Sequence, residues 1–260
     1  MIILAPGCTH FDRIDPRTKR RMNLCYRTYR LRARCVFEYF CAFLTTRGGE
    51  KARPALLVRS GTGTPNWISP LECLKLAVGT STFECCETNH AQIKTCLKSI
   101  ARVLLEKMIK ERTESLFKVH DFALARFHKT LSVWWLRGLP CDKSSPDSVS
   151  SSQAFLQHLH WDNVKDGPWF DRCGISILIY VVANDNIVVL RELLNKLEAS
   201  DSSLRKKRLR GEVPAQGVTS LGITGRLTTL VAAMGFASSE FVSLLLEHGA
   251  DPYVMFKDKA

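Results

Sequence analysis

The chain has 260 residues and a formal net charge of +12, with 45% hydrophobic and 9% aromatic residues. This composition fits a globular protein and excludes a disordered one. No uncharged run reaches the roughly 18 residues that a membrane helix needs, and residues 1–5 are too short for the apolar part of a secretory signal. We therefore expect a soluble, intracellular protein, in the cytoplasm or the nucleus, with no membrane span.

The ten cysteines are scattered, and none forms a C-x-x-C pair. In a chain of this length without a secretory signal, this pattern indicates reduced thiols, most of them small buried apolar residues. A zinc site could be assembled from the group Cys73, Cys85, Cys86, His90 and Cys96. Structural zinc, however, prefers Cys pairs about two to four residues apart, so we expect no metal site.

Residues 1–68 form a basic arm, which we expect to be partly disordered or to hold one amphipathic helix at about residues 19–43. The first 60 residues carry 13 Lys and Arg against four acids, which is +9 of the net +12. Such an imbalance favours nucleic acid, an acidic protein or an anionic lipid as a partner. Tyr26 and Tyr29 beside Arg27 and Arg30 could stack on single-stranded bases, although helix packing explains the same spacing.

Residues 69–140 are predicted to be helical. Ser69, Pro70 and Glu72 fit the start of one helix, and Asn89 can cap the next. The long run that follows has no Gly or Pro until Gly138, and we expect it to break into two packed helices near residues 112–115. Its apolar positions recur at helical spacing: Ile93, Leu97, Ile100, Leu104 and Met108, then Val119, Ala123, Phe127, Leu131 and Trp134.

Residues 141–152 are predicted to be a Ser-rich linker, since six Ser fall between positions 144 and 152. A short helix at about residues 153–160 follows. Two later segments then share one pattern at an offset of 52 residues. Ser176 and Thr228 each precede a short apolar stretch, a polar turn and a Leu-rich stretch that ends near residues 194 and 246. A hydroxyl that can cap a helix, followed by two apolar stretches around a turn, predicts a helix-turn-helix unit.

These segments resemble the ankyrin repeat, whose pattern reads D-x-x-G-x-T-P-L-H-x-A-A-x-x-G-H-x-x-x-V-x-x-L-L-x-x-G-A-D. The most specific stretch is LLLEHGADP at residues 244–252, and the divergent repeats cover about residues 171–197 and 223–253. The resemblance implies an all-α fold, in which a helical N-terminal region precedes a short ankyrin-type α-solenoid within residues 153–260.

The two segments depart from the family pattern. Thr229-Leu230-Val231 and Ile177-Leu178-Ile179 replace the family's Pro-Leu-His, and Asp185 and Ala237 replace its Gly between the helices. The offset of 52 residues also exceeds the family's period of about 33. The excess indicates an insertion at about residues 198–221, which holds the basic run Arg205, Lys206, Lys207, Arg208 and Arg210. This run could be a nuclear import signal or a phosphate contact, and a solvated loop is the plainer interpretation.

The resemblance implies a scaffold or adaptor for protein–protein interaction. Its partner-binding side would place Tyr180, Asn184, Val231 and Gly235 near the surface, with the basic run at the rim. A basic rim predicts an acidic protein partner and an association that is sensitive to salt. Because the last repeat has no cap, a homo-oligomer could form through it.

No enzyme, cofactor or catalytic residue is predicted. The sequence lacks the G-x-S-x-G, G-K-[ST] phosphate-loop and H-E-x-x-H patterns. Two alternatives remain beside the scaffold. In one, the Arg-rich N-terminal arm makes this a nucleic-acid-associated protein. In the other, residues 69–165 form a divergent enzyme domain to which the repeats are appended.

Overall fold

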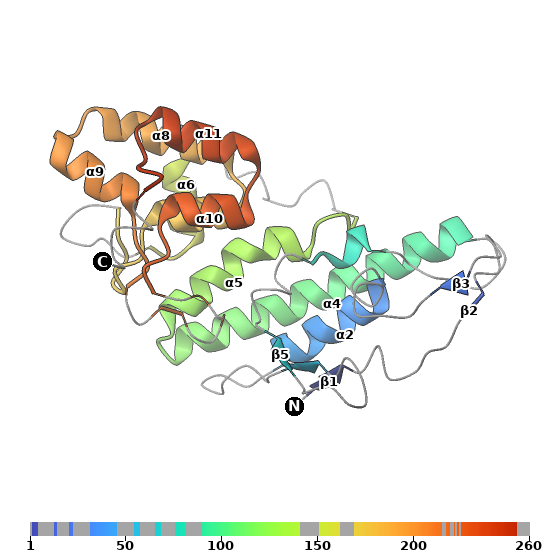
Figure 1. Ribbon diagram of the computed structural model, residues 1–260. Coiled ribbons are helices and arrows are strands. Elements are labelled where there is room, and N and C mark those ends of the chain that lie inside the picture. Colours follow the sequence, from blue (N-terminus) through green and yellow to red (C-terminus); the bar gives the residue numbers. More distant parts are fainter. Residues whose placement is uncertain are drawn as a thin grey trace. The chain divides into compact units, whose positions relative to one another are not determined.

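The structure is a computed structural model of the chain (Figure 1). It describes five short strands and residues 32–45, 76–81, 90–140, 151–161, 169–214, 217–218, 221, 223 and 225–253. The chain divides into two compact units: Met1–Val119 with Trp134–Asp142, and His120–Val133 with Lys143–Ala260. Part of the region predicted as residues 69–140 therefore belongs to the unit that holds the hairpins.

The first unit contains α2 (Ala33–Leu44), the short 3-10 helix η1 (Val78–Thr80) and α4 (His90–Lys118). α2 packs against both α4 and η1. Its buried side chains recur every three or four residues, and Phe40 and Phe43 lie against Trp135, with ring centroids 5.5 and 6.0 Å apart. Aromatic pairs at these separations are a favourable core contact.

The predicted start of the first helix is wrong. The helix begins at Ala33 rather than near residue 19, and Arg21–Met22 forms the strand β3. Residues 23–31 lie outside the residues that the structure describes.

The strands are short. β1 (Ile2–Leu4) pairs in parallel with β4 (Ala55–Leu57), which pairs antiparallel with β5 (Asn66–Ile68). β2 (Arg13–Ile14) pairs antiparallel with β3. Strands of two or three residues leave helices as the dominant structure of the described residues, which agrees with the all-α prediction in its coarse form.

α4 carries two apolar stripes, and the one whose spacing predicted the helix is largely exposed. Ile93, Leu97, Ile100 and Leu104 are 39–50% exposed, whereas the buried apolar positions are Ala101, Leu105, Ile109 and Leu116. Both sets recur at helical spacing. Periodicity alone could not choose between two apolar stripes on one helix.

The predicted break at residues 112–115 is also wrong, because those residues lie inside α4. The break follows Lys118, where His120 takes a positive φ of 60°. Asp121 then begins α5 (Phe122–Trp135), since its Oδ1 accepts a hydrogen bond from Leu124 N at 3.3 Å. A short polar side chain at a helix start is a strong cap, and Asp121 was the signal that the sequence analysis missed.

The second unit starts with His120–Val133, which holds most of α5, and its next helix is α6 (Ser152–His158). Residues 141–150 of the predicted linker lie outside the described residues. Ser151 caps α6 by accepting a hydrogen bond from Ala154 N at 3.2 Å. The Glu192 carboxylate accepts two more, from Ser152 N at 2.6 Å and from Ser152 Oγ at 2.7 Å. Two oxygen acceptors therefore satisfy the first free N–H groups of this short helix.

Two helical hairpins follow at the predicted positions. The first consists of α7 (Ile177–Ala183) and α8 (Ile187–Glu198), and the second of α10 (Thr229–Phe236) and α11 (Ser239–Glu247). Their first helices, α7 and α10, lie side by side, and each contacts the second helix of its own hairpin (Figure 1). As predicted, Ser176 Oγ and Thr228 Oγ1 cap these first helices, accepting from Leu178 N and Val231 N at 3.2 and 3.3 Å.

Among the described helices, none is both long and apolar enough to cross a membrane.

Candidate binding site

The chain that leads into each hairpin folds back on itself in the same way. Asp171 N donates to Ile175 O and Ile177 N donates to Trp169 O, both at 3.0 Å. At the second hairpin, Val213 N donates to Leu227 O and Thr229 N donates to Gly211 O, again at 3.0 Å. We call these two folded-back segments the first finger (residues 169–176) and the second finger (residues 211–228).

The turn of each finger needs a residue with positive φ. Gly174 supplies it in the first finger with φ 77°, and Arg226 supplies it in the second with φ 63°. Gly174 N donates to Asp171 O at 2.9 Å, and Arg226 N donates to Val213 O at 2.8 Å. Gly takes this conformation without a steric penalty, whereas Arg does not, so the second finger is held in a less favourable backbone state.

The excess residues of the second segment lie in two places. The isolated bridge of the first finger joins Phe170 and Ser176, six positions apart, and that of the second joins Glu212 and Thr228, sixteen positions apart. Ten residues are therefore added within the second finger. The other addition is α9 (Ser202–Arg210), a helix of nine residues.

The basic run is helical, so its interpretation as a loop is wrong. Asp201 caps α9, accepting hydrogen bonds from Ser203 N at 3.3 Å and from Ser203 Oγ at 2.8 Å. The preceding segment Asp201-Ser202-Ser203 is a good helix start, and the run lacks Gly and Pro until Gly211. As a helix, the run presents its five cations in different directions.

Two of the five cations tie α9 to the rest of the unit. Arg205 Nη2 donates to His248 O at 3.1 Å, at the end of α11. Arg208 lies over the Trp169 ring, 5.2 Å from its centroid, and donates to Ser200 Oγ at 3.0 Å. Hydrogen bonds and cation–π contacts of this kind stabilise the position of the helix. We therefore separate Arg205 and Arg208 from the candidate binding residues.

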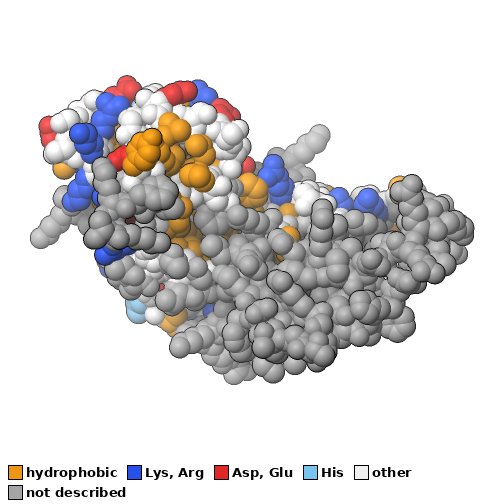
Figure 2. Space-filling model, in the orientation of Figure 1, with side chains coloured by type: hydrophobic (Ala, Val, Ile, Leu, Met, Phe, Trp, Pro, Cys, Tyr) orange, Lys and Arg blue, Asp and Glu red, His pale blue; other side chains and the backbone are white. Residues whose placement is uncertain are grey.

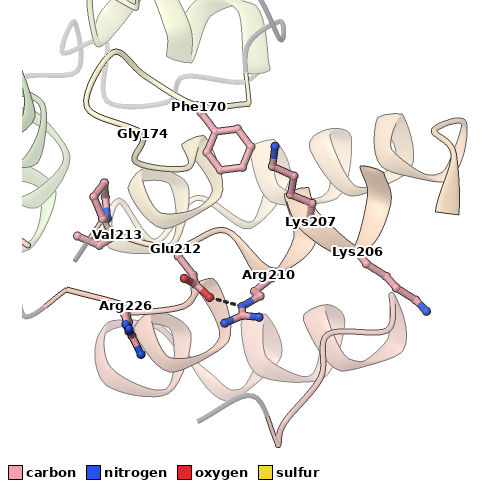
Figure 3. Close-up of a pocket in the computed structure, with 9 residues that line it drawn as sticks. Phe170, Gly174, Lys206, Lys207, Arg210, Glu212, Val213 and Arg226 are labelled. Carbon is pink, nitrogen blue, oxygen red and sulfur yellow. Dashed lines mark ion pairs between the residues drawn. The ribbon is translucent and has the colours of Figure 1, made fainter. Parts of the chain in front are cut away.

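The other three cations line an open pocket of about 630 Å³ between α9 and the two fingers. The lining residues are Phe170, Gly174, Lys206, Lys207, Arg210, Glu212, Val213, Pro214 and Arg226. Figure 3 shows Lys207 beside the Phe170 ring and Arg210 facing Glu212, while Lys206 extends away from them. Lys207 Nζ lies 6.0 Å from the centroid of the Phe170 ring, and Arg210 forms an ion pair with Glu212.

The pocket combines positive charge with an apolar wall. Four cationic side chains and one carboxylate give its lining a formal charge of +3. Phe170, Val213 and Pro214 supply the apolar part. The adjacency of cations and an aromatic ring suits a ligand that carries both negative charge and an apolar group.

The placement of Tyr180 near the surface is wrong, because this side chain is fully buried. Its hydroxyl donates to Asp171 Oδ2 at 3.0 Å, and its ring packs on Phe127 and Trp161, with centroids 4.7 and 5.7 Å away. Burial, and then the negative charge of Asp171, raise the pKa of Tyr180 well above its usual value of 10.0. Tyr180 is thus a core residue of the first hairpin.

The remaining predicted positions differ in exposure. Asn184 is half-buried and donates from Nδ2 to Thr130 O at 3.1 Å. Val231 is half-buried, and Gly235 is exposed, with nothing within 4 Å of the place where a Cβ would stand. Val231 and Gly235 therefore remain available for contact on α10.

The second hairpin leaves an apolar face uncovered. Val182 and Leu194 of the first hairpin are fully buried, but their counterparts 52 positions later, Met234 and Leu246, are 70% and 43% exposed. Figure 2 shows hydrophobic side chains gathered over α10 and α11. This is the face through which self-association was expected.

Sequence reasoning missed Phe170, Glu212 and Arg226 as pocket residues. Phe170 precedes the D-x-x-G turn, and Glu212 follows the basic run directly, so neither stood out from its neighbours. Arg226 occupies the position that Gly174 has in the first finger, and the ten added residues hid that equivalence.

Among the residues that the structure describes, no cluster of three or more His, Cys, Asp or Glu side chains could hold a metal ion. Models of known protein families, curated proteins and solved structures gave no match to this chain.

Proposed function

We propose that this chain is a binding scaffold of the ankyrin-repeat type, which recognises a protein partner and has no catalytic activity of its own. The observation that carries the proposal is the repeated geometry of the two fingers and hairpins. Three backbone hydrogen bonds, one positive-φ residue and one hydroxyl cap recur at matching places. Helical hairpins that stack through their first helices are typical of repeat scaffolds.

The exposed surface of the second hairpin supports protein recognition. Its first helix is strongly apolar, yet Met234 and Gly235 face solvent. Together with Leu246 on α11, Met234 forms part of an exposed apolar patch, and patches of this kind mark protein interaction sites. Because α9 and the second finger add positive charge beside it, the partner is expected to be acidic.

The nucleic-acid alternative rests on the basic arm. Eight of the thirteen Lys and Arg in the first 60 residues lie between positions 17 and 34. Binding driven by these charges would fall steeply with salt and would show little preference for sequence. The enzyme alternative at residues 69–165 gains no specific support from the pocket, because all its lining residues lie between positions 170 and 226.

The scaffold is tested by capture of partners with the full chain. We expect the wild-type chain to retain one or more proteins from a nuclease-treated lysate, and Gly235→Gln to lose them. The Gln side chain projects into open space, so it blocks the surface without disturbing the core. The control Gly235→Ala adds only a methyl group to the same site and should retain the partners.

Thermal unfolding of both variants checks that the fold is intact. Retention of the same proteins by Gly235→Gln at wild-type levels would contradict a binding surface on α10. Capture of protein only from a lysate that has not been treated with nuclease would instead support the nucleic-acid alternative.

A further inference from the structure

The pocket between α9 and the fingers has the features of a recognition site for a specific kind of segment. We propose that it binds an acidic stretch of the partner protein in which a large apolar side chain, such as Phe, is flanked by carboxylates. This inference rests on the proposed function and names the chemistry of the partner.

Charge is the first reason. Lys207 and Arg210 from α9 and Arg226 from the second finger line the same pocket. Cations arranged around one hollow attract a carboxylate more strongly than the same cations spread over a surface, because each lies within one Debye length of the ligand. The carboxylates of an acidic peptide match this arrangement.

The apolar wall is the second reason. Val213 is 1% exposed, so surrounding residues hold it in place. Phe170 is partly exposed and places an aromatic ring at the edge of the pocket. A Phe side chain from a ligand could bury apolar area against this ring and against Pro214. A volume of about 630 Å³ is large enough for such a side chain and its neighbours.

Glu212 is the third reason, and it favours a peptide over nucleic acid. Its carboxylate lines the pocket and is paired with Arg210, and a carboxylate can accept further hydrogen bonds. A peptide backbone offers an N–H donor at each residue, which a carboxylate such as Glu212 can accept, whereas a phosphodiester backbone has no donor. A single aromatic ring in the lining also differs from the series of rings on which bases usually stack.

The test is a fluorescence anisotropy titration of the full chain with a labelled Glu-Asp-Phe-Asp-Glu peptide. We expect binding that weakens with added salt, and weakens about tenfold in the double variant Lys207→Gln/Arg226→Asn. Asn tolerates the positive φ of position 226, so this variant removes charge without adding strain. The control Lys107→Gln/Lys110→Gln removes the same charge from exposed positions of α4 and should bind as the wild type does.

Competitors separate the chemistries. A Glu-Asp-Ala-Asp-Glu peptide should compete about tenfold less well than the Phe peptide, because the apolar contact is lost. Oligothymidylate and pyrophosphate should compete more weakly still. The assignment is overturned if the peptide does not bind, if the double variant binds it equally, or if pyrophosphate or oligothymidylate competes as well as the peptide.

Capture of partner proteins distinguishes failure of the pocket assignment from failure of the scaffold function. If the pocket variant retains the captured proteins while Gly235→Gln loses them, the scaffold stands and the pocket assignment fails. If both variants retain them, the α10 surface fails as a binding site as well. The proposed function itself fails if the wild-type chain captures no protein.

Discussion

Arg126 and Asp171 form an ion pair whose side chains are both fully buried, with Nη1 and Oδ2 3.1 Å apart. Asp171 Oδ1 also accepts from Cys173 N and Ile175 N, at 2.8 and 2.9 Å, which fixes the turn of the first finger. Arg126 Nε and Nη2 donate to the carbonyls of Leu159 and His160. The pair thus joins α5, the end of α6 and the first finger within one unit.

Replacing the charge of Asp171 should destabilise this unit strongly. Asp171→Asn keeps a side-chain oxygen for the turn but leaves the Arg126 guanidinium buried without its carboxylate. We expect the free energy of unfolding to fall by about 3–5 kcal/mol, measured by urea denaturation. Glu240→Gln, which removes an exposed ion pair with Arg191, should cost less than about 1 kcal/mol.

A double substitution shows whether the pair acts as a unit. Arg126→Met together with Asp171→Asn removes both charges, so the cost should be clearly smaller than the sum of the two single costs. Simple additivity would mean that the two side chains do not interact, and would contradict the pair.

The sequence predicts the hairpins well because their determinants are local. Ser176 and Thr228 cap helices whose apolar residues follow directly, and a positional offset reveals the second copy. The link from Arg126 to Asp171 spans 45 positions, and no local pattern encodes it. Its one signal was a charged residue within the apolar stretch of residues 122–127, which indicates a buried and therefore paired charge.

The candidate site was predictable only in part. Composition identified Lys206, Lys207 and Arg210 as a basic group, but it could not say which of the five cations would face the pocket. That choice depends on α9 being a helix and on Arg205 and Arg208 finding partners elsewhere. The second finger forms the other side of the pocket. Its equivalence to the first finger is visible only in the backbone hydrogen bonds.

Glu192 should make stability depend on acid pH. Hydrogen bonds from Lys196 and from Ser152 lower the pKa of Glu192 from 4.5 to about 2. Because the pKa of this carboxyl is lower in the folded than in the unfolded state, the ionised group stabilises the fold at pH values above about 4.5. That stabilisation disappears as the pH falls from about 4.5 to about 2.

Unfolding of Glu192→Gln across that range measures the contribution. Since the Glu192 side chain is 34% exposed, solvent screening reduces its effect to about 1 kcal/mol at neutral pH. The difference between wild type and variant should disappear near pH 2. A constant difference at all pH values would contradict the lowered pKa.

Two glycines in this unit should respond oppositely to Ala. Gly211 has φ 37°, and a Cβ there would meet Ser176 Oγ and Thr229 Oγ1 at 2.6 Å. Gly211→Ala should therefore destabilise the protein by about 1–3 kcal/mol, since both backbone strain and steric overlap oppose it. Gly235→Ala, in helix α10 with open space around it, should stabilise by about 0.5–1 kcal/mol. Chemical denaturation of both variants compares them, and a loss of stability in Gly235→Ala would count against a helix at that position.

Equivalent positions of the two hairpins give the last prediction. Val182 and Met234 lie 52 residues apart in the first helix of each hairpin, and they are 0% and 70% exposed. Val182→Glu would bury a carboxylate without a partner, which costs more than about 4 kcal/mol and should leave the unit unfolded. Met234→Glu keeps its charge in water and should change the free energy of unfolding by less than about 0.5 kcal/mol. Circular dichroism during thermal unfolding distinguishes the two. If both substitutions lowered the free energy of unfolding by similar amounts, Val182 and Met234 would be equally buried, which would contradict a covered first hairpin and an open second one.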